Sequence, residues 1–160
     1  MDRRKKRIVL FGLLSLAMLA FIFIRSAQPS ADSKEESNRI LELLRTLFDP
    51  KGVFFTERWT TIIRKIAHFA EFAVLGALIG GFTLSLCELR GARYYALPLL
   101  LVLLAGVVDE TIQTFVLGRS GSPRDVLLDF CGSIAGLVLA AVVIQLHRRR
   151  QTRKKTENNS

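Results

Sequence analysis

The apolar residues of this chain are gathered into four long blocks, separated by polar stretches that hold most of the charge. The blocks run near residues 8–24, 66–86, 95–117 and 126–146. A bilayer core about 30 Å thick needs about 20 apolar residues in helical conformation to cross it. We therefore predict an all-α integral membrane protein, a helical bundle of about four transmembrane helices. The first block is the shortest, because Arg25 closes it.

A weaker pattern lies between the first two blocks. Residues 26–38 are small and polar, which predicts a flexible segment with little to bury. Over residues 40–49 apolar positions recur with helical spacing, which predicts an amphipathic helix. Ten residues are too few to cross a bilayer, so this helix is expected at the outer membrane surface. Phe54, Phe55 and Trp59 follow as an expected interfacial anchor.

The start of the chain has two interpretations, a secretory signal peptide or an uncleaved anchor. Basic residues precede the first apolar block, as in a signal peptide, but the stretch from Ile8 to Ile24 is longer than a typical signal core. No small-x-small cleavage site follows it. We predict an anchor and three regions: a cytoplasmic basic N-terminus at 1–7, a membrane domain at 8–146, and a disordered cytoplasmic basic tail at 147–160.

The formal net charge of +9 is explained by the arrangement of the basic residues. With four spans and the N-terminus inside, the cytoplasmic pieces hold thirteen Lys and Arg against three acids, and the remainder holds ten against eleven. Basic residues that flank spans mark the cytoplasmic side and attract anionic lipid. We therefore predict a multi-pass protein of a bacterial plasma membrane with both termini in the cytoplasm. The expected partners are membrane lipids, and nucleic acid is excluded as a partner.

Two pairs of small residues predict close helix packing. Gly76 and Gly80 are four apart in the second block, and Gly132 and Gly136 are four apart in the fourth. Small residues at this spacing let transmembrane helices approach each other closely. We expect a structural role for these glycines rather than a ligand-binding one.

The informative feature is a set of polar residues inside the spans and in the segment between the last two. They are Lys65, His68, Glu71, Asp109, Glu110, Gln113, Arg119, Arg124, Asp125 and Asp129. In the predicted topology those inside the spans lie in the outer half of the membrane, with Asp109 about 12 Å below the outer end of its span, and Arg119, Arg124 and Asp125 lie in the outer connecting loop. The inner halves are almost wholly apolar.

Ionisable groups at this depth cost about 2.5–3.5 kcal/mol each on insertion scales, so they must face one another or water. We expect an outward-facing polar pocket with cations at the rim and with Asp109 and Glu110 at the floor. Lys65, His68, Arg119 and Arg124 lie on other segments of the chain and are the expected countercharges. The alternative is that buried ion pairs only fix the register of the helices. A lysine near a span's edge can also snorkel, and a lone histidine is often a packing residue.

At these residues the chain resembles the VanZ-like family of bacterial membrane proteins. Two segments carry the resemblance, RKIAHFAEFAVLG at 64–76 and DETIQTFVLGRSGSPRDVLLDFCGSIAG at 109–136. The name-giving members are associated with resistance to teicoplanin, a lipid-tailed glycopeptide that acts on the lipid-linked cell-wall precursor at the outer membrane surface. The resemblance implies a role at the cell envelope.

The chain departs from the family pattern at four positions. Ile112 stands where many relatives have a second histidine, Leu117 where proline is common, Phe72 where tyrosine is common, and Asp129 where asparagine is common. These departures weaken any mechanism that needs a second histidine or that tyrosine hydroxyl.

Three functions remain open at this point. The first is an envelope protein that binds or modifies phosphate-bearing lipids or affects susceptibility to a teicoplanin-type drug. The second is an intramembrane enzyme with His68 as acid or base and with Glu71, Asp109 or Glu110 as partners or ligands of a hard divalent ion. The third is a small proton-coupled transporter, which the apolar inner halves disfavour. No nucleophile motif or dense metal-ligand spacing is present, so we assign no catalytic residue, metal or cofactor.

Overall fold

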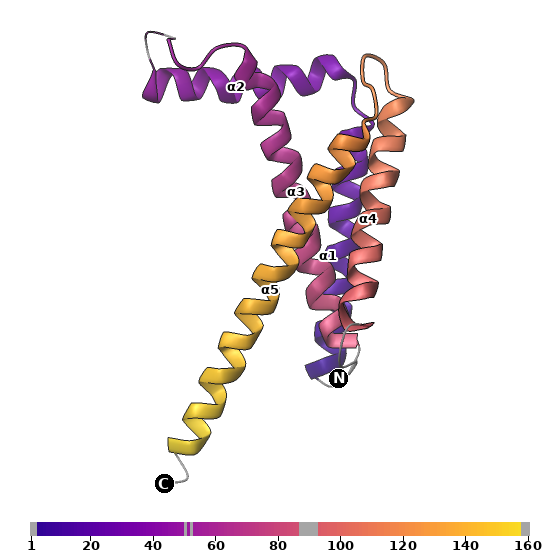
Figure 1. Cartoon of the computed structure of the whole chain (residues 1–160), viewed down its shortest axis with the longest axis vertical. Helices are drawn as coiled ribbons and strands as arrows, with labels where there is room; N and C mark the ends of the chain where they lie inside the picture. Colours follow the sequence, from indigo (N-terminus) through magenta and orange to yellow (C-terminus); the bar gives the residue numbers. More distant parts are fainter. Residues whose placement is uncertain (1–2, 50, 52, 87–92, 158–160) are drawn as a thin grey trace.

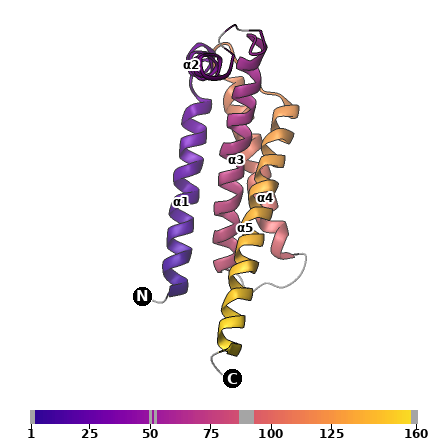
Figure 2. The same ribbon diagram turned by 90° about the vertical axis from the view of Figure 1, so that its left-hand side faces the viewer.

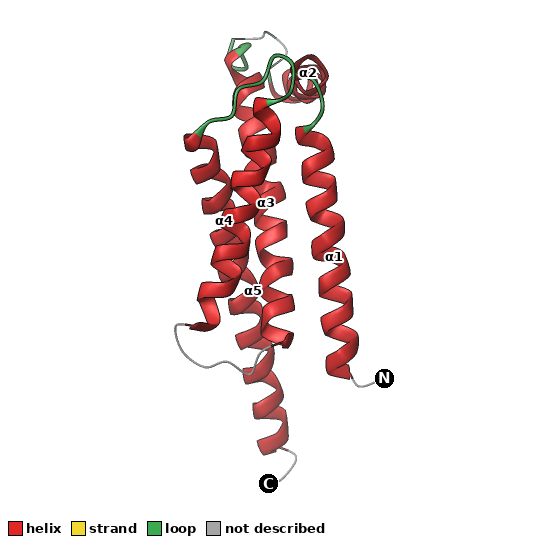
Figure 3. Cartoon of the chain, turned by 90° about the vertical axis from the view of Figure 1, so that its right-hand side faces the viewer, coloured by secondary structure: helices red, strands yellow, loops and turns green. Residues whose placement is uncertain are grey.

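The computed structural model describes residues 3–49, 51, 53–86 and 93–157. Within these residues it contains helices and no strand (Figure 3), which confirms the predicted all-α class. The helices are α1 (Arg3–Ser26), α2 (Ser30–Phe48), α3 (Arg58–Leu86), α4 (Arg93–Thr114) and α5 (Pro123–Glu157).

Four of these helices are long and apolar enough to cross a membrane, which confirms the predicted number of spans. The candidate spans are Arg4–Ser26, Arg58–Thr83, Ala96–Thr114 and Pro123–Leu146. Large apolar side chains such as Leu16 and Leu139 are more than 60% exposed, at 64% and 63%. Such a surface suits contact with lipid rather than water, and the protein is a multi-pass membrane protein.

The four spans run side by side, and α2 lies across one end of the bundle (Figures 1 and 2). Both ends of the chain lie at the opposite end of the bundle, and α5 crosses α3 before extending beyond the other helices (Figure 1). An even number of spans places the two termini on one side. We refer to the end covered by α2 as the α2 end.

The predicted flexibility of residues 26–38 is wrong from Ser30 onward, because α2 begins there rather than near residue 40. The buried residues of α2 are Ser30, Ser33, Ser37 and Leu41, which recur on one face of the helix. Ser37 Oγ donates to the Ser33 carbonyl at 3.0 Å, so its hydroxyl is satisfied within the helix. A face of small hydroxyl side chains can pack against the bundle without any apolar signal in the sequence.

The predicted disorder of the basic tail is also wrong, since α5 continues to Glu157. Arg, Lys and Gln are good helix formers, and extending an existing helix avoids the cost of nucleating a new one. Residues 158–160 lie outside the described part of the chain.

The tightest helix contact is the crossing of α3 and α5. A Cβ added to Gly76, Gly132 or Gly136 would overlap a backbone oxygen of the facing helix. Gly80 is less restricted, because its nearest neighbour is the end of the Leu137 side chain at 2.9 Å. Because these contact positions are glycines, α3 and α5 approach each other closely. This close approach also fixes the positions of the polar residues on both helices.

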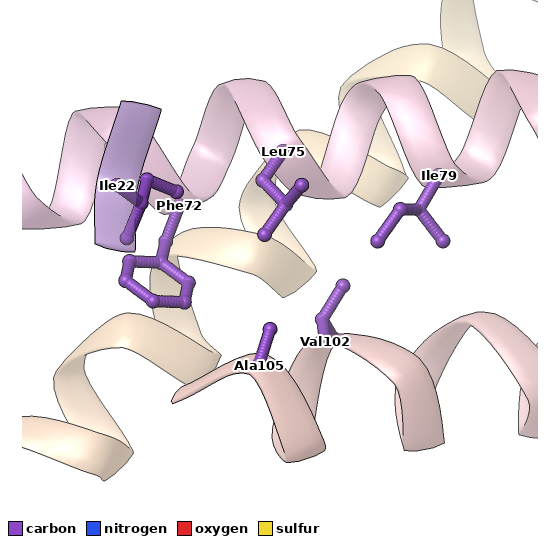
Figure 4. Packing of buried hydrophobic residues seen from close by; sticks show 6 residues of the cluster. All are labelled: Ile22, Phe72, Leu75, Ile79, Val102 and Ala105. Atoms are coloured by element: carbon purple, nitrogen blue, oxygen red, sulfur yellow. The ribbon is translucent and has the colours of Figure 1, made fainter. Parts of the chain in front are cut away.

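An apolar core joins α1, α3 and α4 (Figure 4). It consists of Ile22, Phe72, Leu75, Ile79, Val102 and Ala105. Ala105 lies one helical turn before Asp109, so the core directly underlies the polar groups of α4.

Candidate polar pocket at the α2 end

A pocket of about 150 Å³ opens at the α2 end, where α3, α4, α5 and the connection between α4 and α5 meet. Its lining residues are Arg64, Lys65, His68, Glu110, Gln113, Gly118, Arg119, Ser120, Ser122, Asp125, Leu128 and Asp129. Most of the polar site residues predicted from the sequence therefore lie together in this pocket, although they come from separate segments of the chain. Arg64 and the serines of the connection were not anticipated.

Three of the predicted site residues do not line this pocket. Glu71 faces α1 and pairs with Arg25 there. Asp109 is fully buried, next to the pocket residues His68 and Asp129. Arg124 has an exposed side chain, and its backbone N–H takes the Ser122 hydroxyl as acceptor at 3.2 Å.

The rim is bridged by an ion pair between Lys65 of α3 and Asp125 of α5. Both side chains are partly exposed, at 47% and 33%, which suits a position near the membrane surface. The three-residue spacing of Lys65, His68 and Glu71 makes their stripe rotate around α3. Lys65 thus meets α5, His68 points toward the interior acids, and Glu71 meets α1.

Glu110 organises the connection between α4 and α5. Its Oε2 accepts the Ser122 backbone N–H at 2.8 Å, and its Oε1 accepts the Gln113 side-chain amide at 3.0 Å. The same amide group of Gln113 donates to Asp109 Oδ2 at 2.9 Å. The connection also needs glycine at Gly118, whose φ is +74°. The carboxylate is therefore part of the pocket wall as well as a charge inside it.

Arg119 reaches from this connection to the end of α1. Its Nη1 donates to the Ser26 carbonyl at 3.3 Å. Burial lowers the pKa of Arg119 from its ordinary value, and the charge of Arg64 adds to the shift. A guanidinium nevertheless stays protonated in proteins, so the pocket keeps a fixed cation.

Arg25 is a site residue that the sequence reading missed. Its guanidinium lies 2.9 Å from Glu36 of α2 and 3.3 Å from Glu71 of α3, so one side chain of α1 ties three helices together. In the sequence, Arg25 served only as the boundary of the first apolar block. Its acidic partners are 11 and 46 residues away in the sequence, so no helical spacing predicts the contact.

The most completely buried ionisable groups are Asp109 and Asp129, which are 0% and 1% exposed. Two of the expected countercharges have other partners, since Lys65 pairs with Asp125 and Arg119 donates to the carbonyl of Ser26. Among the described residues, no ion pair joins a cation to Asp109, Glu110 or Asp129. The depth of Asp109 was also overestimated, since α4 ends at Thr114, about 7 Å beyond it.

The fold and the pocket together define a four-span helical membrane protein with a polar site at one end of its bundle. The family model described as VanZ/LLP1 matches residues 11–144, and the chain belongs to this family. The resemblance seen in the sequence is thus confirmed. No curated protein and no solved structure matches the chain.

Proposed function

We propose that this protein acts at the cell envelope, with its pocket facing the outer leaflet of a bacterial plasma membrane and holding the phosphate-bearing head group of an envelope lipid. The observation that carries the proposal is the lining of the pocket. Arg64, Lys65 and Arg119 supply positive charge, and Ser120 and Ser122 supply hydroxyl groups. Cations and hydroxyls in one small cavity are the donors that phosphate oxygens take.

The orientation rests on the charge distribution. The two basic terminal segments lie at the end of the bundle opposite α2 (Figure 1), and basic residues mark the cytoplasmic side. With this orientation the α2 end, and the pocket with it, faces outward. A pocket at the end of a span lies at the level of lipid head groups, so a lipid ligand can keep its tail in the bilayer.

The size of the pocket favours a head group over a whole drug molecule. Sites for drug-sized ligands measure about 300–1,000 Å³, whereas this pocket measures about 150 Å³. A lipoglycopeptide of the teicoplanin type does not fit such a volume. Any effect on susceptibility to such a drug would then follow from binding of the lipid on which the drug acts.

An intramembrane enzyme acting on the same class of lipid is the alternative, because His68 lies beside two carboxylates next to the pocket. A proton-coupled transporter is less consistent with the structure. Phe72, Leu75 and Val102 are 0% exposed and close the interior toward the end with the termini.

The proposal is tested with purified protein in detergent and two soluble probes, farnesyl monophosphate and farnesol, which share a tail and differ in the phosphate. We expect the phosphate to bind at least about tenfold more tightly, because charge-assisted hydrogen bonds contribute about 1.5–3 kcal/mol each. Arg119→Lys and Lys65→Gln should weaken phosphate binding by a similar factor. Arg124→Gln removes one positive charge from an exposed side chain beside the pocket, and it should leave phosphate binding nearly unchanged. Equal binding of both probes, or an equal loss with Arg124→Gln, would contradict the proposal.

A further inference from the structure

Three ligand-type side chains from three helices converge beside the pocket. His68 of α3, Asp109 of α4 and Asp129 of α5 each bring one potential ligand atom, and these atoms all lie within 4.8 Å of one another. The two carboxylates are almost completely buried, at 0% and 1% exposed. Because each residue is fixed on a different span, the packing of the bundle sets the geometry of the group.

Several polar atoms of this group lack protein partners, although Asp109 Oδ2 accepts the side-chain amide of Gln113. Neither carboxylate oxygen of Asp129 has a hydrogen bond to any described residue, and the buried Nδ1 of His68 has none either. Burying a carboxylate without a hydrogen bond or a counterion costs several kcal/mol. The missing partner must therefore be something other than these side chains.

Three of the nearby cations have other partners, and Arg64, which lines the pocket, forms no ion pair with Asp109 or Asp129 in the described part of the chain. Lys65 pairs with Asp125, Arg25 pairs with Glu36 and Glu71, and Arg119 donates to the carbonyl of Ser26. Among the described residues, no cation therefore forms an ion pair with Asp109 or Asp129. A bound cation would supply a direct countercharge and would satisfy the free oxygens at the same time.

We propose that His68, Asp109 and Asp129 form a binding site for one divalent metal ion, of the class of Mn²⁺. Carboxylate oxygens suit hard ions such as Mg²⁺, Ca²⁺ and Mn²⁺, and an imidazole nitrogen favours a transition metal among them. Three protein ligands leave coordination positions free. His68 and Asp129 also line the pocket, so an ion held here is reached from the pocket and can accept a further oxygen ligand there.

The site rests on its own geometry and not on the proposed lipid ligand, so the two can fail separately. The test uses full-length protein in detergent, stripped of metal with a chelator and titrated with Mn²⁺. Electron paramagnetic resonance measures the free ion. We expect about one Mn²⁺ per chain, and Asp129→Asn should weaken binding by at least about tenfold. The matched control is Asp32→Asn, the same change at an exposed position of α2 outside the pocket, which should have little effect.

Two further readouts separate a metal site from a structural role. Mn²⁺ should raise the melting temperature of the wild-type protein but not that of Asp129→Asn, whose own folding the same scan reports. Spin-echo measurements should detect nitrogen coupled to the bound ion, and His68→Gln should abolish that coupling. Absence of Mn²⁺ binding by the wild-type protein would overturn the site and assign the carboxylates to a protonated pair. Equal weakening by Asp32→Asn would also overturn it, because that result would mean diffuse attraction of cations.

Discussion

Asp109 of α4 and Asp129 of α5 lie side by side in the interior, with carboxylate oxygens within 4.8 Å of each other and of an imidazole nitrogen of His68. Two acids held this closely in a buried place cost free energy unless something compensates their charge. These two acids lie at the α2 end of the bundle, whereas the neighbouring core is apolar. Ionisable groups inside a membrane protein are by default a functional-site hypothesis, and the proposed site is built on these two.

The ion pair between Arg25 and Glu71 should contribute more to stability than a surface pair. Glu71 has a side chain only 13% exposed, so Arg25→Met leaves a largely buried carboxylate without its partner. We expect a loss of about 2 kcal/mol in the free energy of unfolding. The double variant Arg25→Met with Glu71→Met should recover most of it.

The matched control for this prediction is Arg39→Met, which breaks the exposed pair with Glu35 and should cost less than about 1 kcal/mol. Thermal unfolding in detergent measures all four proteins. Equal losses for Arg25→Met and Arg39→Met would show that Arg25 does not tie the helices together.

The crossing of α3 and α5 should tolerate no side chain at Gly136. A Cβ there overlaps the backbone oxygen of Ala73, so Gly136→Ala should destabilise the protein by about 1–3 kcal/mol. Gly106 of α4 is the control, because a Cβ there comes no closer than 3.7 Å to other atoms. Gly106→Ala should be neutral or stabilising by up to about 1 kcal/mol, through helix propensity. A Gly136→Ala protein that melts at the wild-type temperature would contradict this packing.

Both termini should lie in the cytoplasm, and α2 should lie outside. In a chain with Cys87→Ser and Cys131→Ser, single cysteines are introduced by Arg39→Cys on α2 or by Lys155→Cys near the C-terminus. A membrane-impermeant maleimide added to intact cells should label the first and not the second, because basic flanks are retained inside. Labelling of the second alone would reverse the orientation and place the pocket on the cytoplasmic side.

The turn between α2 and α3 should respond to acid through Asp49. Its carboxylate accepts the backbone N–H groups of Phe54 and Phe55 at 2.6 and 2.8 Å, and the bond from Phe55 is the largest cause that lowers the pKa of Asp49 from its ordinary 3.8. A lowered pKa in the folded state means that the carboxylate stabilises the turn above the ordinary value. That stabilisation is lost as the pH falls below about 3.8.

Trp59 reports on this turn, because it is the sole tryptophan and its ring lies 5.1 Å from that of Phe55. We expect its fluorescence to stay constant from pH 7 down to about 4 and to change below that. In Asp49→Asn the turn is altered at neutral pH and the acid transition is lost. An unaltered transition in that variant would show that other acids cause it.

The sequence predicted the fold best where continuous runs of apolar residues mark the helices. The lengths of the four blocks predicted the number of spans, because crossing a bilayer requires a minimum run of apolar residues. It failed for residues 30–38, where a buried face made of serine carries no apolar period. It also failed for Arg25, whose partners are set by how α1, α2 and α3 pack rather than by spacing along one helix.

Within the site, residue types and the segment that carries each one were predictable, but their pairing was not. Glu110 illustrates the difference. From the sequence it reads as a countercharge for a cation, and Glu110→Gln looks like a clean removal of charge. In the structure both of its oxygens accept N–H donors, from Ser122 and Gln113. The amide NH₂ of a glutamine at this position would face the N–H donor of Ser122 or of Gln113 and could not accept from it. This substitution therefore also disturbs the connection between α4 and α5.

The most direct test of the proposed function is identification of the lipids that stay bound to gently purified protein, by native mass spectrometry. We predict a bound lipid whose head group carries phosphate or pyrophosphate, enriched over its share of the membrane, and lost in Arg119→Lys because a lysine cannot replace a planar guanidinium at a two-point contact. The Arg124→Gln protein should keep it. Recovery of bulk phospholipids alone, in the proportions of the membrane and equally from all three proteins, would contradict a pocket that holds a phosphate-bearing envelope lipid.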